Sequence, residues 1–326
     1  MNAASLSQID RARVYVATVP GAISGAGGHN ATFAVACKLV EFGLAANEAW
    51  PLLLEFNQRC QPQWSERELH HKLEDAFRRA RPRSGFASRT SRSRFVSTPK
   101  AKIDPQTALE NFLRGFKCDE LDLWEASPIR PPDDWTKDAA CIVAMLYEAN
   151  ELINVVTNYQ LDEEGKARPD GIGVTLPRNE MISRLARGGF QSEAGGWLRM
   201  NPLDGCDVTD ANVTAFRFAL IECDHAPLEL QLSLLAKLPL PIAVILTSGG
   251  RSVHAWVRVD AATLDEYRHD VSWMLALLAR FGVDDKNKNP SRMSRLPGVA
   301  RSIGAAGDGH QRLLYLNPQP AQKAIL

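Results

Sequence analysis

The amino-acid sequence predicts an α+β domain preceded by a small all-α domain. Two apolar runs with strand character, 216–221 and 241–246, flank a short segment with helical spacing. A third apolar run, 255–259, follows the second across a Gly-Gly turn, which is typical of a β-hairpin. Helical patterns dominate the first 80 residues instead.

The all-α domain is expected over residues 1–80. Apolar side chains recur at helical spacing in 31–40, and a second helix is expected over 46–58. Ser65 and Glu68 have the spacing of a capping box and predict the start of a third helix.

Residues 81–103 are expected to form a basic flexible linker. Arg and Lys recur between 78 and 102 without any acidic residue, and Ser, Thr, Gly and Pro fill the gaps. Such a segment can also contact DNA phosphates without sequence preference. The remaining residues, 104–326, are assigned to the α+β domain.

The composition indicates a globular protein of the cytoplasm. Hydrophobic residues make up 45% and charged residues 23%, and the formal net charge is zero, so no global nucleic-acid signature is present. The sequence contains no long apolar run and no signal-peptide pattern, so we expect no membrane contact. Its six cysteines form no Cys-x-x-Cys pair, which indicates reduced thiols and no zinc site.

The first apolar run ends in two carboxylates, Glu222 and Asp224. Side chains alternate along a strand, so these two point to the same side, with Cα atoms about 6 to 7 Å apart. That separation suits oxygen ligands of a hard cation such as Mg²⁺. The alternative is an ordinary solvated strand end.

The turn between the second and third runs has the features of an anion-binding site. Gly249 and Gly250 let backbone N–H groups approach an anion closely, and Arg251 adds positive charge. His254 lies on the strand face opposite the apolar side chains and is expected to face a site. The alternative is a hairpin turn without a ligand.

Together these features resemble the archaeo-eukaryotic primase superfamily, the primase-polymerases of bacterial and mobile-element replicons. Its motifs are an acidic pair at a strand end, a small-residue turn followed by x-His, and a single Asp. In mobile-element members an Arg-x-x-Arg-Leu-Pro-Gly run follows, and residues 292–298 here read Arg-Met-Ser-Arg-Leu-Pro-Gly. The resemblance covers roughly 104–318. The first 80 residues resemble the helical PriCT domain, in the pieces 28–33, 53–57 and 64–69.

The resemblance implies a catalytic core with an RRM-like antiparallel sheet and a second lobe. It also implies template-dependent nucleotidyl transfer that makes or extends primers on single-stranded DNA from NTP or dNTP, with a replicative helicase as a further partner. Asp284 is favoured over Asp285 as the third carboxylate, since it follows a small-apolar lead and has the better spacing to Arg292.

The implied site has three parts. Two-metal catalysis with Mg²⁺ or Mn²⁺ would use the carboxylates of Glu222, Asp224 and Asp284. The triphosphate would be bound by a larger set: Ser248, Gly249, Gly250, Arg251, His254, Arg292 and Arg295. Two lysines add positive charge that suits the template strand or the triphosphate: Lys286 and Lys288.

Two other functions are compatible with parts of the sequence. A metal-dependent nuclease could use the same carboxylates, but it would not explain the 248–251 turn together with His254. A catalytically inactive replication-initiation or DNA-binding accessory module would show no Mn²⁺-dependent binding of triphosphate.

Overall fold

The computed structural model describes residues 7–23, 28–80 and 104–326, so the predicted linker at 81–103 lies outside the described residues. The chain divides into two compact units, residues 6–107 and residues 108–326. Helix α5 (Pro105–Leu113) crosses the boundary between them. Within the described ranges, no helix combines the length and the apolar character that spanning a bilayer requires.

In its described residues, the N-terminal unit contains four complete helices: α1 (Gln8–Thr18), α2 (Gly28–Glu41), α3 (Ala46–Asn57) and α4 (Glu66–Arg79). The expected capping box begins α4, because Ser65 Oγ accepts from the N–H of Glu68 and the Glu68 carboxylate accepts from the N–H of Ser65. Apolar side chains from all four helices form the core of this unit, with Phe56 and Leu53 fully buried at its centre. Helix α1 was not anticipated from the sequence.

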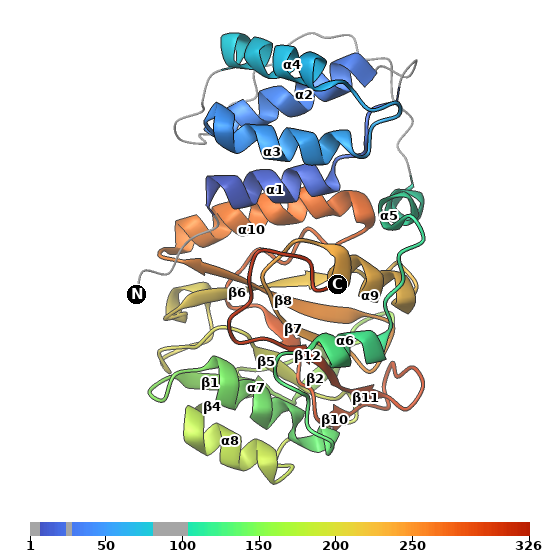
Figure 1. The fold of residues 1–326 in the computed structure, drawn as a ribbon. Helices are drawn as coiled ribbons and strands as arrows, with labels where there is room; N and C mark the ends of the chain where they lie inside the picture. The colour runs from blue at the N-terminus through green and yellow to red at the C-terminus, as the bar shows by residue number, and fades with distance from the viewer. Residues whose placement is uncertain (1–6, 24–27, 81–103) are drawn as a thin grey trace. The chain divides into compact units, whose positions relative to one another are not determined.

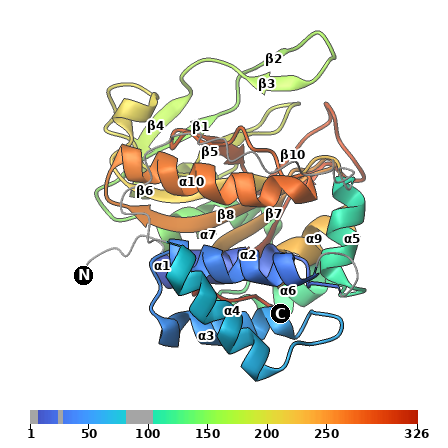
Figure 2. The same ribbon diagram turned by 90° about the horizontal axis from the view of Figure 1, so that it is seen from above.

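The first sheet of the C-terminal unit contains β6 (Phe216–Glu222), β7 (Ile242–Thr247), β8 (Val253–Ala261) and β12 (Leu313–Leu316). Its strand order is β12-β7-β8-β6, and every neighbouring pair is antiparallel. Helices α9 (Leu228–Lys237) and α10 (Leu264–Leu278) interrupt the strands, giving the element order strand–helix–strand–strand–helix–strand. Figure 2 shows α10 running across this sheet.

A second antiparallel sheet has the order β4-β1-β5-β9. Its strands are β1 (Leu152–Val156), β4 (Val174–Pro177), β5 (Trp197–Arg199) and β9 (Met293–Arg295). Helices α7 (Asp138–Leu146) and α8 (Arg178–Ala186) lie on the side of this sheet away from α10 (Figure 1). One apolar core joins the two sheets, and it includes Phe218 and Trp256 from the first sheet and Ile153 and Leu198 from the second.

Smaller elements complete the C-terminal unit. The chain between β1 and β4 forms a hairpin of β2 (Tyr159–Leu161) and β3 (Ala167–Pro169), which projects from the sheets (Figure 2). A second short pair joins β10 (Val299–Ala300) to β11 (His310–Gln311). One further helix and three single turns of 3₁₀ helix are described: α6 (Glu120–Ala126), Trp135–Lys137, Asp210–Asn212 and Ala279–Phe281.

The predicted mixture of helices and antiparallel sheet is therefore confirmed for the described part of the C-terminal unit. The RRM-related topology and the PriCT-like character of the N-terminal unit stay predictions. The residue pattern of 152–159 predicts a single strand, which is wrong at its end. The chain leaves the second sheet after Val156 and starts the β2–β3 hairpin, whose base is closed by a hydrogen bond from the N–H of Asp170 to the carbonyl of Asn158.

Candidate active site

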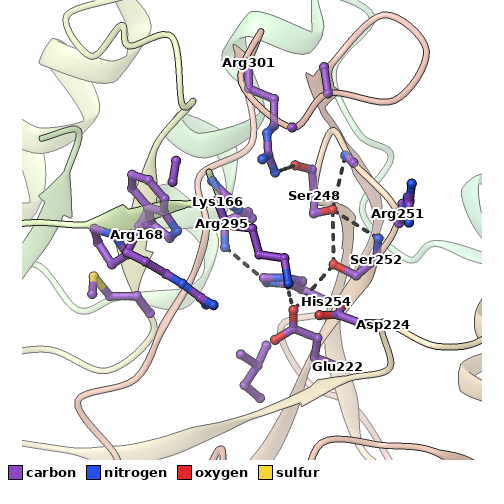
Figure 3. A pocket seen from close by; sticks show the side chains of 18 of the residues that line it. Lys166, Arg168, Glu222, Asp224, Ser248, Arg251, Ser252, His254, Arg295 and Arg301 are labelled. Atoms are coloured by element: carbon purple, nitrogen blue, oxygen red, sulfur yellow. Dashed lines mark hydrogen bonds and ion pairs between the residues drawn. The ribbon is translucent and has the colours of Figure 1, made fainter. Parts of the chain in front are cut away.

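One large pocket in the C-terminal unit, with a volume of about 740 Å³, contains most of the side chains that the sequence singled out. We call it the central pocket. It is lined by the ends of β6 and β8, the 248–252 turn, the 287–295 segment, the β2–β3 hairpin and the 301–305 segment (Figure 3). Both sheets therefore contribute to it.

The carboxylates of Glu222 and Asp224 line the central pocket together. Strand β6 ends at Glu222, and the alternation that the sequence predicts brings Asp224 to the same side. Burial, and then the charge of Glu222, raises the pKa of Asp224. Burial alone would also raise the pKa of Glu222, but the neighbouring His254 lowers it to about 2. These shifts are those of two carboxyl groups close enough to repel each other when both are ionised.

His254 connects the acidic pair to the second sheet. It lies opposite Glu222 in the β6–β8 register, with Nε2 3.4 Å from Glu222 Oε1. On the other side of the ring, Nδ1 accepts from the backbone N–H of Arg295 at 3.2 Å and lies 3.0 Å from Ser294 Oγ. Because Nδ1 is an acceptor, the ring proton of the neutral form is on Nε2, towards Glu222.

The 248–252 turn is held closed by the hydroxyl of Ser248. Its Oγ accepts from the N–H of Gly250 and the N–H of Ser252, both at 3.3 Å. The Ser252 hydroxyl lies 3.5 Å from Glu222 Oε1, so the turn adjoins the carboxylates. Three of the residues predicted to bind nucleotide line the pocket here: Ser248, Gly250 and Arg251.

Gly249, which was also predicted to bind nucleotide, is not among the residues that line the pocket. A Cβ atom at this position would lie 2.4 Å from the carbonyl oxygen of Gly309, and the φ of Gly249 is +67°. The residue is therefore needed where the turn and the chain near Gly309 approach each other.

Two predicted arginines, Arg292 and Arg295, reach the pocket from the segment that contains β9. The Arg295 guanidinium lies over the Trp197 ring, 4.5 Å from its centre, and donates to the carbonyl of Ala194 at 2.9 Å. Burial, and then the charge of Arg301, lowers the pKa of Arg295 to about 9. Arg292 donates to the carbonyl of Lys286 at 3.1 Å.

The third predicted carboxylate is placed beside the pair only by its backbone. The N–H of Asp284 donates to the carbonyl of Glu222 at 2.9 Å, whereas its Oδ1 accepts from the N–H of Lys286. Neither Asp284 nor Asp285 lines the pocket, and neither do the predicted Lys286 and Lys288. In the parts of the chain that the structure describes, no three His, Cys, Asp or Glu side chains are grouped to hold a metal ion.

Sequence reasoning missed three basic side chains that line the pocket: Lys166, Arg168 and Arg301. Lys166 forms an ion pair with Glu164 (2.6 Å), and Arg168 forms one with Asp162 (2.9 Å). Arg301 had a weak signal, since it opens a glycine-rich stretch just after the Arg-Leu-Pro-Gly run.

No family model and no curated protein matches this chain. Among solved structures, it is similar to the AEP domain of the cyanophage S-2L primase-polymerase, with 19% identity over 55% of this chain and 88% of that chain, and a TM-score of 0.36. It is also similar to the catalytic domain of primase RepB′ in complex with initiator DNA, with 15% identity over 58% of this chain and 89% of that chain, and a TM-score of 0.37. A second RepB′ primase structure has 15% identity over 57% of this chain and 58% of that chain, with a TM-score of 0.35. All three of these structures are described as primases or primase-polymerases.

Proposed function

We propose that this protein is a nucleotidyltransferase that makes or extends primers on a single-stranded DNA template from NTP or dNTP. The observation that carries the proposal is the charge arrangement of the central pocket. Among the described residues, six basic and three acidic side chains line it. Two of the acidic ones, Glu222 and Asp224, sit side by side at one wall, which leaves most of the positive charge free for a polyanion.

The acidic pair fits a divalent cation. Its members are oxygen donors two positions apart at one strand end. Burial, and then the charge of Glu222, raises the pKa of Asp224, and a bound cation would relieve this repulsion. Mg²⁺ or Mn²⁺ bound by Glu222 and Asp224 would make the primer 3′-hydroxyl more nucleophilic and the α-phosphate more electrophilic. Asp284 as a third ligand, and a second metal ion, stay predictions from the sequence.

The opposite wall suits a triphosphate. Arg292 and Arg295 line the pocket, and within the described residues neither forms an ion pair with a carboxylate. Guanidinium groups of this kind neutralise the negative charge that develops on a departing pyrophosphate. The neighbouring turn keeps its shape because the N–H groups of Gly250 and Ser252 donate to Ser248 Oγ.

His254 supports both walls in this proposal. It keeps Glu222 ionised through its Nε2 contact, and it fixes the backbone of Arg295 through Nδ1. The acidic and basic walls are thus linked by one buried side chain. A metal-dependent nuclease would need the carboxylates but not this arrangement of basic groups.

Primer synthesis on single-stranded DNA tests the proposal. The reaction uses labelled ATP or dATP with Mg²⁺ or Mn²⁺, and it compares the wild-type chain with Asp224→Ala and with the exposed-surface control Asp265→Asn. We expect products that lengthen with time from the wild type and the control, and none from Asp224→Ala. If the wild type gives no product even on an annealed primer, the proposal is wrong.

A further inference from the structure

We infer that Arg301, rather than Arg251, is the arginine that binds the triphosphate at the 248–252 turn, and that the 301–309 segment is built to hold it there. This inference rests on the proposed function, because it assigns a binding residue for the same nucleotide. It replaces the expectation from the sequence that the arginine inside the turn does this work.

Arg301 is fixed at the edge of the turn by two hydrogen bonds. Its Nε donates to the carbonyl of Ile303 at 2.8 Å, and its Nη1 donates to the carbonyl of Ser248 at 3.4 Å. The guanidinium therefore lies against the turn and also lines the central pocket (Figure 3). No carboxylate of the described chain forms an ion pair with it.

Arg251 is placed differently. It also lines the central pocket, but it is exposed, and its side chain lies across the turn from Arg295 and Arg301 (Figure 3). Its backbone carbonyl accepts from Gln231 Nε2 at 2.9 Å, which anchors the residue towards α9. A triphosphate in the pocket would meet Arg301 and Arg295 before it met Arg251.

The chain around Arg301 leaves space for its guanidinium. A Cβ atom at position 304 would lie 2.5 Å from Arg301 Nη2, so only glycine fits beside the guanidinium as it stands. The segment is also tied to the turn, because the N–H of Ala306 donates to the carbonyl of Gly249 at 3.0 Å. Turn and segment therefore form one unit that presents the Arg301 side chain.

The pairing of Arg301 with Arg295 points to a polyanion as the ligand. Burial lowers the pKa of both groups, and the charge of Arg301 is the next cause for Arg295, so the two cations repel each other in a partly desolvated place. Phosphate oxygens relieve that repulsion, and a guanidinium binds them through two N–H groups at once. The terminal phosphates of a nucleoside triphosphate supply this chemistry.

Nucleotide binding tests the assignment. We would measure the dissociation constants of ATP and AMP in Mn²⁺ for the wild type, Arg301→Ala, Arg301→Lys and Arg251→Ala. Arg301→Ala should weaken ATP binding by about 10- to 100-fold, the range expected for a lost hydrogen bond to a charged group. AMP binding should change far less, and Arg301→Lys should recover part of the loss. A role limited to holding the turn would weaken ATP and AMP equally, and a larger loss in Arg251→Ala than in Arg301→Ala would overturn the inference.

A pair of glycine variants makes the test independent of the arginine itself. Gly304 and Gly307 have similar φ values, +66° and +61°, so alanine strains the backbone similarly at both. Only the Cβ at 304 meets Arg301, because nothing lies within 4 Å of a Cβ at 307. We expect Gly304→Ala to weaken ATP binding and Gly307→Ala to keep it. Equal binding by both variants contradicts the inference, whereas failure of the wild type to bind ATP contradicts the proposed function instead.

Discussion

His254 and Glu222 face each other across β8 and β6, and the histidine also holds the neighbouring sheet through Arg295. The ring is buried, with 5% of the residue exposed, so both of its nitrogens act within the protein. One side chain thus helps to set the charge of Glu222 and the position of the strand that carries Arg295, which we propose to bind phosphate.

Replacing His254 by Phe should therefore reduce activity and stability together. The variant keeps an aromatic ring but removes the acceptor for Arg295 and the partner of Glu222. We expect primer synthesis to fall by about 100-fold and the free energy of unfolding to fall by about 1 to 3 kcal/mol. Full activity in a folded His254→Phe variant, as judged by circular dichroism, would argue against the coupling of the two walls.

The two candidates for the third carboxylate can be separated directly. Only Asp284 donates its N–H to the Glu222 carbonyl, whereas Asp285 is exposed to solvent. We expect Asp284→Ala to lower the rate of primer extension by about 100-fold, equivalent to about 3 kcal/mol, and Asp285→Ala to change it little. The reverse order of the two effects would move the third ligand to Asp285.

Arg199 should act through stability rather than binding. It does not line the pocket, and its Nε donates to Asn154 Oδ1 at 3.0 Å while its Nη1 donates to the carbonyl of Ser291 at 2.6 Å. Arg199→Met leaves both buried acceptors without this donor and should cost about 2 to 4 kcal/mol in urea unfolding. Arg187 is exposed, so Arg187→Met serves as the control, and its free energy of unfolding should stay within about 0.5 kcal/mol of the wild-type value. Equal stability of the two variants would contradict the buried role.

Asp138 should make the stability of the protein depend on pH. Its Oδ2 accepts from the N–H of Leu313 at 2.7 Å, whereas Oδ1 has no partner in the described structure. Burial raises the pKa of Asp138 to about 7, although the Leu313 N–H and Arg312 oppose this rise. When the pKa of a carboxyl group is higher in the folded state than in the unfolded state, the free energy of unfolding of the protein falls as the pH rises between the two values. Here the unfolded pKa is about 4.

Asp138→Asn removes this titration. From pH 4.5 to pH 7.5, the free energy of unfolding of the variant should therefore rise relative to that of the wild type, by at most about 4 kcal/mol. Urea unfolding of both proteins at the two pH values measures the difference, and other titrating groups cancel in the comparison. A wild-type-to-variant difference that is the same at both pH values would mean that Asp138 is ionised in the folded protein.

The features of the site that could be predicted from the sequence are those that depend on the local geometry of a strand. Strand alternation predicted that Glu222 and Asp224 lie on one side and that His254 faces away from its apolar neighbours. The β6–β8 register, which places His254 opposite Glu222, was not predicted. The third carboxylate was harder, because the direction of the Asp284 side chain depends on its own loop.

Contacts between residues far apart in the chain could not be predicted from the sequence. Arg301 meets Ser248 across 53 positions of the chain, and no local pattern announces that contact. Lys166 and Arg168 reach the pocket because the chain turns out of the second sheet after Val156, a departure that apolar patterning alone did not reveal. Gly249 was predicted only as part of an anion-binding turn. Its close approach to Gly309, which requires glycine, could not be predicted because the two residues lie far apart in the sequence.

Strand β12 has a consequence for the order of events on the ribosome. It pairs with β7 in the first sheet. Its backbone N–H groups at Leu313 and Leu316 also donate to the side chains of Asp138 and Ser127, which lie more than 170 positions earlier in the chain. When every acidic and basic residue of the pocket has been synthesised, the nascent chain still lacks this strand. The site should thus mature only after residue 316 has left the exit tunnel, and pairing at such separation is intrinsically slow.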